Sequence, residues 1–353
     1  MDIDIKYDSS TLKNYKLVQP GDFIISLRSF QGGFETSYLT GITSPAYTIF
    51  NFIDNQSQNH MFWQYLFKRK NFINSLKKVT FGIRDGKAIS FSQFGDVKVE
   101  YPDFDEQKHI AITLNKIDDT IQLHERKCEE LALIKKVLLQ KLFPKKDEIK
   151  PEVRYKNFSD AWEQRKLGEI YGKIGNAFVG TATPFYVDKE NGHFYLESNN
   201  VKDGHINRNN EIFINDEFYK KQQNKWLHTG DIVMVQSGHV GHSAVIPKEL
   251  NNIAAHALIM FRYPVEKVEP NFINYQFQTI QSKKKIENIT TGNTIKHILA
   301  SDLRNFSVSI PVYSEQEKVG NFLQHFDTLI ALHQRKLEKL KQLKKFLLQN
   351  MFI

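Results

Sequence analysis

Hydrophobic and polar positions alternate at helical spacing in two long stretches of the chain. In Ile117–Phe143 apolar or small residues recur at alternating intervals of three and four positions, and Phe326–Phe352 repeats this pattern. Such spacing is typical of a coiled-coil seam. Each stretch follows a proline. Soon after that proline comes a polar residue that could cap the helix, Asp105 in the first copy and Ser314 in the second. The pattern therefore predicts two long amphipathic helices.

The two predicted helices belong to an internal repeat. A shift of 209 positions aligns Tyr101–Phe143 with Ile310–Phe352 without a gap, and 18 of the 43 aligned residues are identical. The same shift aligns Pro-Gly-Asp at Pro20–Asp22 with Thr-Gly-Asp at Thr229–Asp231, and each triplet leads into an apolar run. A period this long indicates a duplicated unit, a globular part followed by a long helix. The helices match closely while the globular parts differ, so we expect the helices to share one task.

The obvious partner for each apolar stripe is the other helix. Because the repeat implies a pseudo-two-fold axis, we predict that the two helices pack antiparallel, with the globular parts at opposite ends. Leu123, Ile134 and Val137 are expected to widen the stripe. We interpret the histidines of the seam as packed side chains, because the helices offer too few further ligands for a metal. The residues expected at the helix-pair interface are Ile121, His124, Leu131, Leu138, Ile330, His333, Leu340 and Leu347.

The globular parts indicate an α+β fold. Apolar runs predict strands at His193–Glu197, Asp231–Gln236 and Ala257–Arg262, whereas Trp162–Ile170 is amphipathic and is predicted to be a short helix. Nothing in the first copy corresponds to Trp162–Asn209, so we expect an N-terminally shortened first globular part. Further predicted elements are strands at Ile212–Ile214, Phe306–Ile310, Phe23–Leu27 and Tyr47–Phe52, and helices at Asn59–Lys77 and Asn271–Ile286. The predicted boundaries are 1–101, 102–143 for the central helix, 144–161 for a linker, 162–310, and 311–353 for the last helix.

Charge and cysteine content narrow the class of protein. The formal net charge of +8 favours a polyanionic partner such as nucleic acid. The chain has one cysteine, Cys128, which excludes an intrachain disulfide and a cysteine-based metal site and suits a reducing compartment. The first residues are polar and acidic, and no apolar run approaches the roughly 20 residues needed to span a bilayer. We therefore expect a cytoplasmic protein without a membrane partner.

The motifs of common catalytic sites are missing from the sequence. It contains no Gly-rich phosphate loop, and the carboxylates in Pro102–Lys108 are adjacent at a helix start rather than spread over separate strands as a nuclease metal site needs. The loop Ser237–Ser243 holds two histidines but no third metal ligand. We predict no catalytic residue and no metal ion on this chain.

Four polar loops, two in each copy, are candidates for contact with DNA. Arg, Gln and Asn side chains hydrogen-bond base edges in the major groove, while Lys and backbone N–H groups hold phosphates. Corresponding loops differ in sequence although the strands that frame them match, as expected for surfaces that bind different sequences. The candidate DNA-binding residues are Arg28, Gln31, Arg84, Lys87, Gln236, His239, His242, Asn293 and Lys296.

Taken together, three motifs resemble the specificity subunits of type I restriction–modification systems. They are WEQRKLGEI at Trp162–Ile170, the two Pro-x₃-Glu-Gln helix starts, and the twin segments that begin HERK at His124 and HQRK at His333. The resemblance implies two target-recognition domains, the first one shortened, that each read one half of a bipartite site in double-stranded DNA. It also implies a non-catalytic subunit that docks modification (methyltransferase) and restriction (translocase and nuclease) subunits. S-adenosylmethionine, ATP and Mg²⁺ would then be bound by those partners, and no cofactor by this chain.

Two alternatives remain open at the level of sequence. The shortened first domain could leave a half-specificity or silent variant in which only the second domain works. The chain could also be a coiled-coil scaffold that never contacts DNA; binding that is absent or independent of salt would favour this interpretation, since phosphate contacts make affinity fall steeply with salt.

Overall fold

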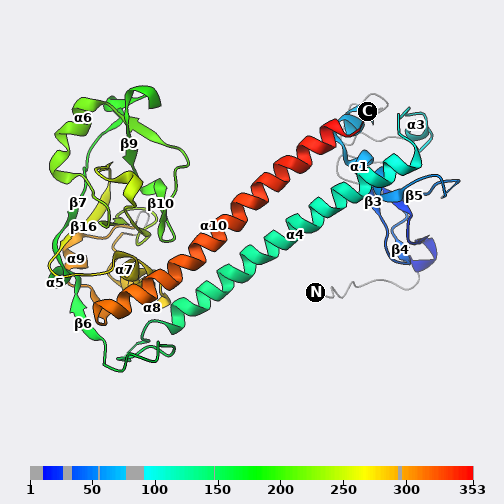
Figure 1. Cartoon of the computed structure of the whole chain (residues 1–353). Helices are drawn as coiled ribbons and strands as arrows, with labels where there is room; N and C mark the ends of the chain where they lie inside the picture. Colours follow the sequence, from blue (N-terminus) through cyan, green and yellow to red (C-terminus); the bar gives the residue numbers. More distant parts are fainter. Residues whose placement is uncertain are drawn as a thin grey trace. The chain divides into compact units, whose positions relative to one another are not determined.

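The computed structural model describes residues 11–26, 34–54, 56–76, 91–146, 148–292 and 296–352. The chain divides into two compact units: unit 1 comprises Met1–Lys127 and His333–Ile353, and unit 2 comprises Cys128–Leu332. Helices α4 (Phe104–Lys141) and α10 (Tyr313–Asn350) each contribute residues to both units (Figure 1). Both are unbroken over 38 residues, so the two predicted long helices are confirmed.

The helix caps lie earlier in the chain than the predicted capping residues. The backbone N–H of Glu106 donates to Asp103 Oδ1 at 2.9 Å, so Asp103 rather than Asp105 caps α4. Ser314 likewise lies inside the first turn of α10, which starts at Tyr313. The cap is set by the residue at which the chain leaves its extended conformation, and a run of several polar residues does not identify that position.

Within each unit the two helices run antiparallel. In unit 1, His333 contacts His124 and Lys344 contacts Asp118, so rising numbers on one helix meet falling numbers on the other. All eight residues predicted at the helix-pair interface are half-buried. Leu123, Ile134 and Val137 are exposed, so the prediction that they widen the buried stripe is wrong. Two packed helices bury a narrow seam, and residues outside that seam stay at the surface.

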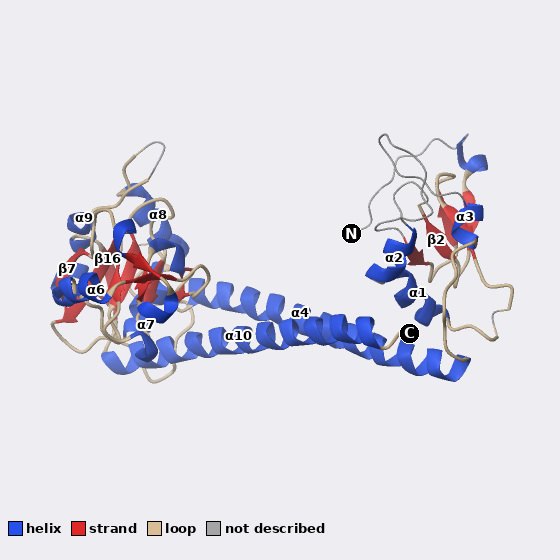
Figure 2. Ribbon diagram, turned by 90° about the horizontal axis from the view of Figure 1, so that it is seen from above, coloured by secondary structure: helices blue, strands red, loops and turns tan. Residues whose placement is uncertain are grey.

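Unit 2 is built around the antiparallel sheet β14-β13-β16-β7. Its central strand β13 is buried along its whole length, and Figure 2 shows helices α7 and α8 flanking the strands of this unit. A second sheet has the order β15-β9-β12-β8, and two-stranded pairs β17-β6 and β10-β11 complete the unit. Its elements are β6 (Glu163–Lys166), α5 (Leu167–Ile170), β7 (Tyr171–Asn176), β8 (Tyr186–Val187), β9 (His193–Leu196), β10 (Val201–Lys202), β11 (His205–Ile206), β12 (Ile212–Ile214), α6 (Asp216–Lys221), β13 (Ile232–Val235), β14 (Ser243–Val245), β15 (Ala254–Ala255), β16 (Leu258–Pro264), α7 (Pro270–Phe277), α8 (Ile280–Asn288), α9 (Ala300–Arg304) and β17 (Ser307–Ile310).

Two predicted helices of unit 2 differ from the structure. Trp162–Ile170 forms strand β6 followed by the single turn α5, because β6 pairs with β17, almost 150 residues further along the chain. The predicted helix Asn271–Ile286 is two helices, and the Thr279 side chain accepts a hydrogen bond from the Ser282 N–H at 3.2 Å to cap the second one. Such a cap stops one helix and starts the next.

Unit 1 repeats part of this arrangement. In its sheet β3-β2-β5, Phe23 of β2 pairs with Phe50 of β5. The corresponding strands of unit 2, β13 and β16, pair Ile232 with Phe261 in the same way. No described residue pairs with the outer edge of β5, where unit 2 has β7. The prediction of a shortened first domain is consistent with this smaller sheet. The elements of unit 1 before α4 are β1 (Lys16–Val18), β2 (Phe23–Ile25), β3 (Phe34–Thr36), β4 (Gly41–Thr43), β5 (Thr48–Phe50), α1 (His60–Lys68), α2 (Lys70–Leu76) and α3 (Phe91–Gly95).

The predicted linker is packed against unit 2. Arg154 donates from Nε and Nη2 to the two carboxylate oxygens of Glu315, both at 2.7 Å, and the Glu315 side chain is completely buried. The Trp162 N–H donates to the Ile149 carbonyl at 2.9 Å. This segment is therefore fixed to the start of α10. Among the described helices, none is both long and apolar enough to span a bilayer.

Candidate nucleic-acid interface

A hollow of about 330 Å³ lies in unit 2 between the loop that joins β13 to β14 and helix α8. The loop supplies Gly238 to His242, the helix supplies Lys283 and Glu287, and a third segment supplies Lys296. The β13–β14 loop and the stretch from α8 to Lys296, which follows it by about 40 residues, thus meet on one concave surface. This is the arrangement expected for a site that binds a large, charged ligand.

Glycines and backbone hydrogen bonds give the β13–β14 loop its shape. Gly238 and Gly241 have φ values of 77° and 89°, in the left-handed region that favours glycine. The Val235 N–H donates to the His242 carbonyl at 2.7 Å, which closes the loop on itself. The Gly238 N–H donates to the Lys296 carbonyl at 3.1 Å and so brings Lys296 to the same surface.

Two lysines and two histidines line the hollow, together with Val240, Ile286, Thr290 and Glu287. Lys283 and Lys296 are exposed, and among the residues that line the hollow Glu287 is the one acidic side chain. Lys296 Nζ lies 3.2 Å from Glu287 Oε1, but both side chains are more than half exposed, so this pair adds little stability. Exposed lysines beside a polar loop can neutralise phosphates and release their counterions.

His242 is held in a defined state at the edge of the hollow. Its Nδ1 accepts a hydrogen bond from the Asp203 N–H at 3.1 Å. Burial lowers the pKa of His242, and the nearby Lys283, His239 and Lys202 act in the same direction, whereas Asp203 opposes them. Because Nδ1 is an acceptor, the proton of the neutral ring resides on Nε2.

The structure brings together three of the residues predicted to bind DNA. His239, His242 and Lys296 line the hollow, whereas Gln236 does not, and its buried Oε1 has no hydrogen-bond partner among the described residues. Sequence reasoning missed Lys283, although the run Lys283–Lys285 was a visible signal. Arg28, Gln31, Arg84, Lys87 and Asn293 lie outside the described residues.

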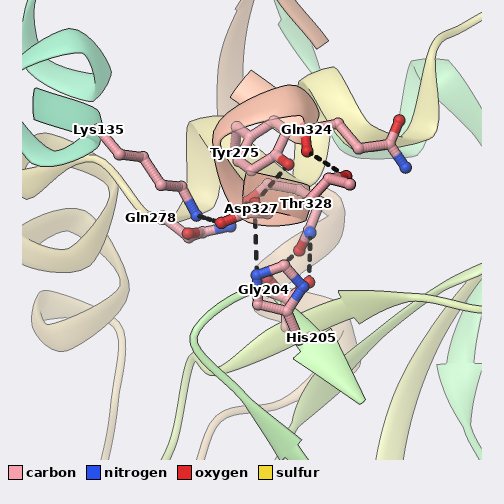
Figure 3. Close-up of polar contacts among 10 residues, drawn as sticks. Lys135, Gly204, His205, Tyr275, Gln278, Gln324, Asp327 and Thr328 are labelled. Atoms are coloured by element: carbon pink, nitrogen blue, oxygen red, sulfur yellow. Dashed lines mark hydrogen bonds and ion pairs between the residues drawn. The ribbon is translucent and has the colours of Figure 1, made fainter. Parts of the chain in front are cut away.

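A buried charge cluster connects α4 to α10 in unit 2. Asp327 Oδ1 lies 2.5 Å from Lys135 Nζ, and its Oδ2 accepts a hydrogen bond from the Tyr275 hydroxyl at 2.6 Å (Figure 3). His205 Nε2 approaches the same Oδ2 to 3.3 Å. Burial pulls the pKa of Asp327 up, but His205 and Lys135 outweigh burial and hold that pKa below its ordinary value. The cluster therefore holds an ionised carboxylate.

Among the described residues of unit 1, the same cluster forms around Asp118 without a histidine. Lys344 Nζ lies 2.6 Å from Asp118 Oδ1, and the Tyr65 hydroxyl donates to Asp118 Oδ2 at 2.8 Å. Each lysine also lies over the ring of its tyrosine, at 5.1 Å in unit 2 and 5.5 Å in unit 1. The internal repeat is thus preserved at the level of individual contacts.

No group of three or more His, Cys, Asp or Glu side chains that could hold a metal ion occurs among the described residues. The pair His124 and His333 lies on the seam with Nδ1 atoms 2.7 Å apart, which is a hydrogen bond between the rings. Two imidazoles without a third ligand suit helix packing better than metal binding.

Known proteins with similar sequences include specificity subunits of type I restriction enzymes. The chain is 26% identical over 262 residues to the type I restriction enzyme MjaVIII specificity subunit of Methanocaldococcus jannaschii, an alignment that covers 71% of this chain and 60% of that protein. It is 28% identical over 287 residues to the putative MjaX specificity subunit of the same organism, with coverages of 79% and 63%. The chain thus spans about three fifths of the length of these relatives.

Solved structures show the same fold. The S subunit of a type I restriction-modification system from M. genitalium superposes with a TM-score of 0.64 at 14% identity, over 96% of this chain and 84% of that one. A chain from a study of complex assembly and conformational transition of the type I R-M system superposes with a TM-score of 0.55 at 16% identity, over 96% and 83%. The family model of the type I restriction modification DNA specificity domain matches residues 5–133 and 159–342, most of the chain. The chain therefore belongs to the family of type I restriction modification DNA specificity domain proteins.

Proposed function

We propose that this chain is the DNA-specificity subunit of a type I restriction–modification complex and that the basic hollow of unit 2 contacts double-stranded DNA. The observation that carries the proposal is the convergence of Lys283, Lys296, His239 and His242 on one concave surface. Lysines there would hold phosphates, and the loop side chains would approach base edges. The chain itself would perform no chemistry.

The outer faces of the long helices support a second part of the proposal, docking of modification subunits. In unit 2, Ile134, Val137 and Leu332 are exposed, and in unit 1 their repeat counterparts Leu343, Phe346 and Leu123 are exposed as well. Exposed apolar residues that recur in both copies indicate two equivalent contact surfaces. Two modification subunits would bind there and supply S-adenosylmethionine for adenine methylation, while restriction subunits would supply ATP- and Mg²⁺-dependent chemistry. We place this assembly in the cytoplasm.

DNA binding can be tested with mixed-sequence duplexes of about 30 base pairs. The affinity of the native chain should fall with rising salt. Lys283→Ala with Lys296→Ala should lower the slope of log K against log salt by about one for each phosphate that the chain no longer neutralises. Lys248→Ala, which removes an exposed lysine outside the hollow, is the matched control. Equal slopes for all variants would place the DNA elsewhere, and absence of binding would favour the scaffold alternative.

The smaller sheet of unit 1 favours a second candidate function, in which unit 2 alone recognises DNA. If unit 1 does not read DNA, unit 2 alone would recognise a half-site, and two chains in one complex would recognise a palindrome. The sequence of the methylated site distinguishes these cases, because two working units give a bipartite asymmetric site.

A further inference from the structure

The turn between β10 and β11 lies between the candidate DNA loop and helix α10. The hairpin pairs Lys202 with His205 across a two-residue turn, in which Asp203 and Gly204 have φ values of 48° and 92°. An Asp-Gly pair suits such a turn because both residues tolerate the left-handed conformation. The turn is therefore a well-defined piece of backbone. It presents three polar groups: the Asp203 N–H, the Gly204 carbonyl and the His205 side chain.

This turn makes a polar contact with each of three neighbouring elements. The Asp203 N–H donates to His242 in the β13–β14 loop, at 3.1 Å. The Gly204 carbonyl accepts from the buried Asn274 Nδ2 of α7, at 2.9 Å, and His205 reaches Asp327 of α10 (Figure 3). Asn274 Oδ1 also accepts from the hydroxyl of Ser243, at 2.8 Å; Ser243 directly follows His242 and is the first residue of β14. The turn thus holds the end of the loop at His242 directly, and at Ser243 through Asn274.

The hydrogen bond to His242 determines what that side chain can offer a ligand. With Nδ1 occupied as an acceptor, the neutral ring has its N–H at Nε2, which suits an acceptor such as a phosphate oxygen or the N7 or O6 atom of a purine. The charged groups around His242 are Lys202, Asp203, His239 and Lys283, with the three basic ones opposing a second proton. The surroundings therefore favour a neutral hydrogen-bond donor over a cation.

We propose that His242 contacts DNA as a neutral Nε2–H donor and that the Asp203–His205 turn positions it by tying the loop to Asp327 of α10. The inference rests on the proposed function, since it names the role of one residue within the proposed DNA site. His205 is a positioning residue in this account, and His242 is the contact.

The internal repeat supports a specific role for His205. Asp118 keeps its lysine and tyrosine partners in unit 1 although no described histidine approaches it. The lysine–aspartate–tyrosine cluster therefore forms without a histidine. The His205 contact is an addition in unit 2, where the β13–β14 loop borders the hollow.

Two substitutions distinguish the role of His242 Nδ1 as an acceptor from that of Nε2 as a donor. In His242→Asn the amide oxygen can still accept from the Asp203 N–H, but the donor at Nε2 is lost. In His242→Gln the amide nitrogen can replace the Nε2 donor, but the tie to Asp203 is lost. His205→Ala breaks the tie to α10. The matched control is His193→Ala, which changes a half-buried histidine on β9 outside the hollow.

The experiment starts with selection of a preferred duplex from a randomised library by the native chain, followed by measurement of affinity for that duplex. We expect His242→Asn to weaken binding about tenfold, His242→Gln less, and His193→Ala not at all. His205→Ala should weaken binding by a smaller factor and add nothing to His242→Asn, because both act through one contact. Native-like affinity of His242→Asn, or additive losses, would overturn the inference.

An independent readout does not depend on DNA. Long-range ¹H–¹⁵N spectra of the native chain should show His242 as the Nε2–H tautomer at neutral pH and a more mixed population in His205→Ala. A cationic ring or the Nδ1–H tautomer would contradict the inference even if DNA binds. If the native chain selects no duplex at all, the proposed function fails, and that result is distinguishable from failure of the His242 assignment.

Discussion

His124 and His333 place their Nδ1 atoms 2.7 Å apart on the seam of the long helices in unit 1. The two residues are counterparts in the internal repeat, so the contact joins equivalent atoms. One ring must donate and the other accept, and a doubly protonated pair loses this hydrogen bond. Burial, His333 and Lys336, in that order, lower the pKa of His124.

This pair makes the stability of unit 1 depend on pH. A histidine whose pKa is lower in the folded state stabilises fully above its unfolded pKa of about 6.5, and that contribution is lost as the pH falls below it. The melting temperature of the native chain should therefore be lower at pH 5.0 than at pH 7.5. This pH-dependent difference should be about 2–4 °C smaller for the double variant His124→Leu/His333→Leu. His109→Gln, an exposed position on α4, should keep the native difference. An unchanged difference in the double variant would show that the pair does not couple stability to protons.

The two lysine–aspartate–tyrosine clusters should differ in energetic importance because they differ in burial. The Lys135 and Asp327 side chains are 11% and 12% exposed, whereas those of Lys344 and Asp118 are 28% and 34% exposed. Asp327→Asn leaves a buried ammonium without a counter-ion and should cost about 3 kcal/mol of unfolding free energy. Asp118→Asn should cost about 1 kcal/mol, since water screens that pair. Urea unfolding measures both, and equal losses would contradict the role assigned to burial.

Glu315 and Glu106 occupy equivalent positions in the internal repeat but differ in burial. Arg154→Met removes both hydrogen bonds to the fully buried Glu315 carboxylate and should destabilise unit 2 by about 3–5 kcal/mol. Glu106 is exposed, and Glu106→Ala should change stability by less than about 0.5 kcal/mol. Chemical denaturation compares them directly. A small effect of Arg154→Met would mean that the segment before unit 2's first strand is not anchored through this contact.

Unit 1 should unfold before unit 2. The described residues of unit 1 form a single buried apolar cluster, whereas unit 2 contains several, and β5 has an outer edge without a described partner. Calorimetry should show two transitions. Phe62→Leu should shift the lower transition, because Phe62 is fully buried and stacks on Phe352. Phe272→Leu should shift the upper one, because Phe272 is fully buried and packs at a tilt against Phe143. A single transition shifted equally by both variants would exclude independent units.

Periodicity and repetition predicted the parts of the fold that depend on local sequence. The long helices and the strands β9, β12, β13, β16 and β17 occur where apolar spacing placed them. One element that depends on a distant partner was missed: β6 is a strand because β17 pairs with it. The break in the predicted helix at Asn271–Ile286 has a local cause, the Thr279 cap, that periodicity does not show.

The candidate site, like the fold, could be predicted from the sequence only in part. Residue type identified His239, His242 and Lys296, which the hollow brings together, but it did not separate them from Gln236, which lies outside it. Lys283 joins the hollow through the packing of α8, and the role of the Asp203–His205 turn depends on contacts with three other elements. Neither feature leaves a periodic signal in the sequence.

The most direct test of the central claim is to express the chain with its modification subunit in a host without DNA methylation and to map methyladenine across the genome. We predict one bipartite, asymmetric motif, which His242→Asn should weaken at the half-site read by unit 2. A palindrome of a single half-site would show that unit 1 reads no DNA. A complex that assembles in full yet leaves the genome unmethylated would contradict the account.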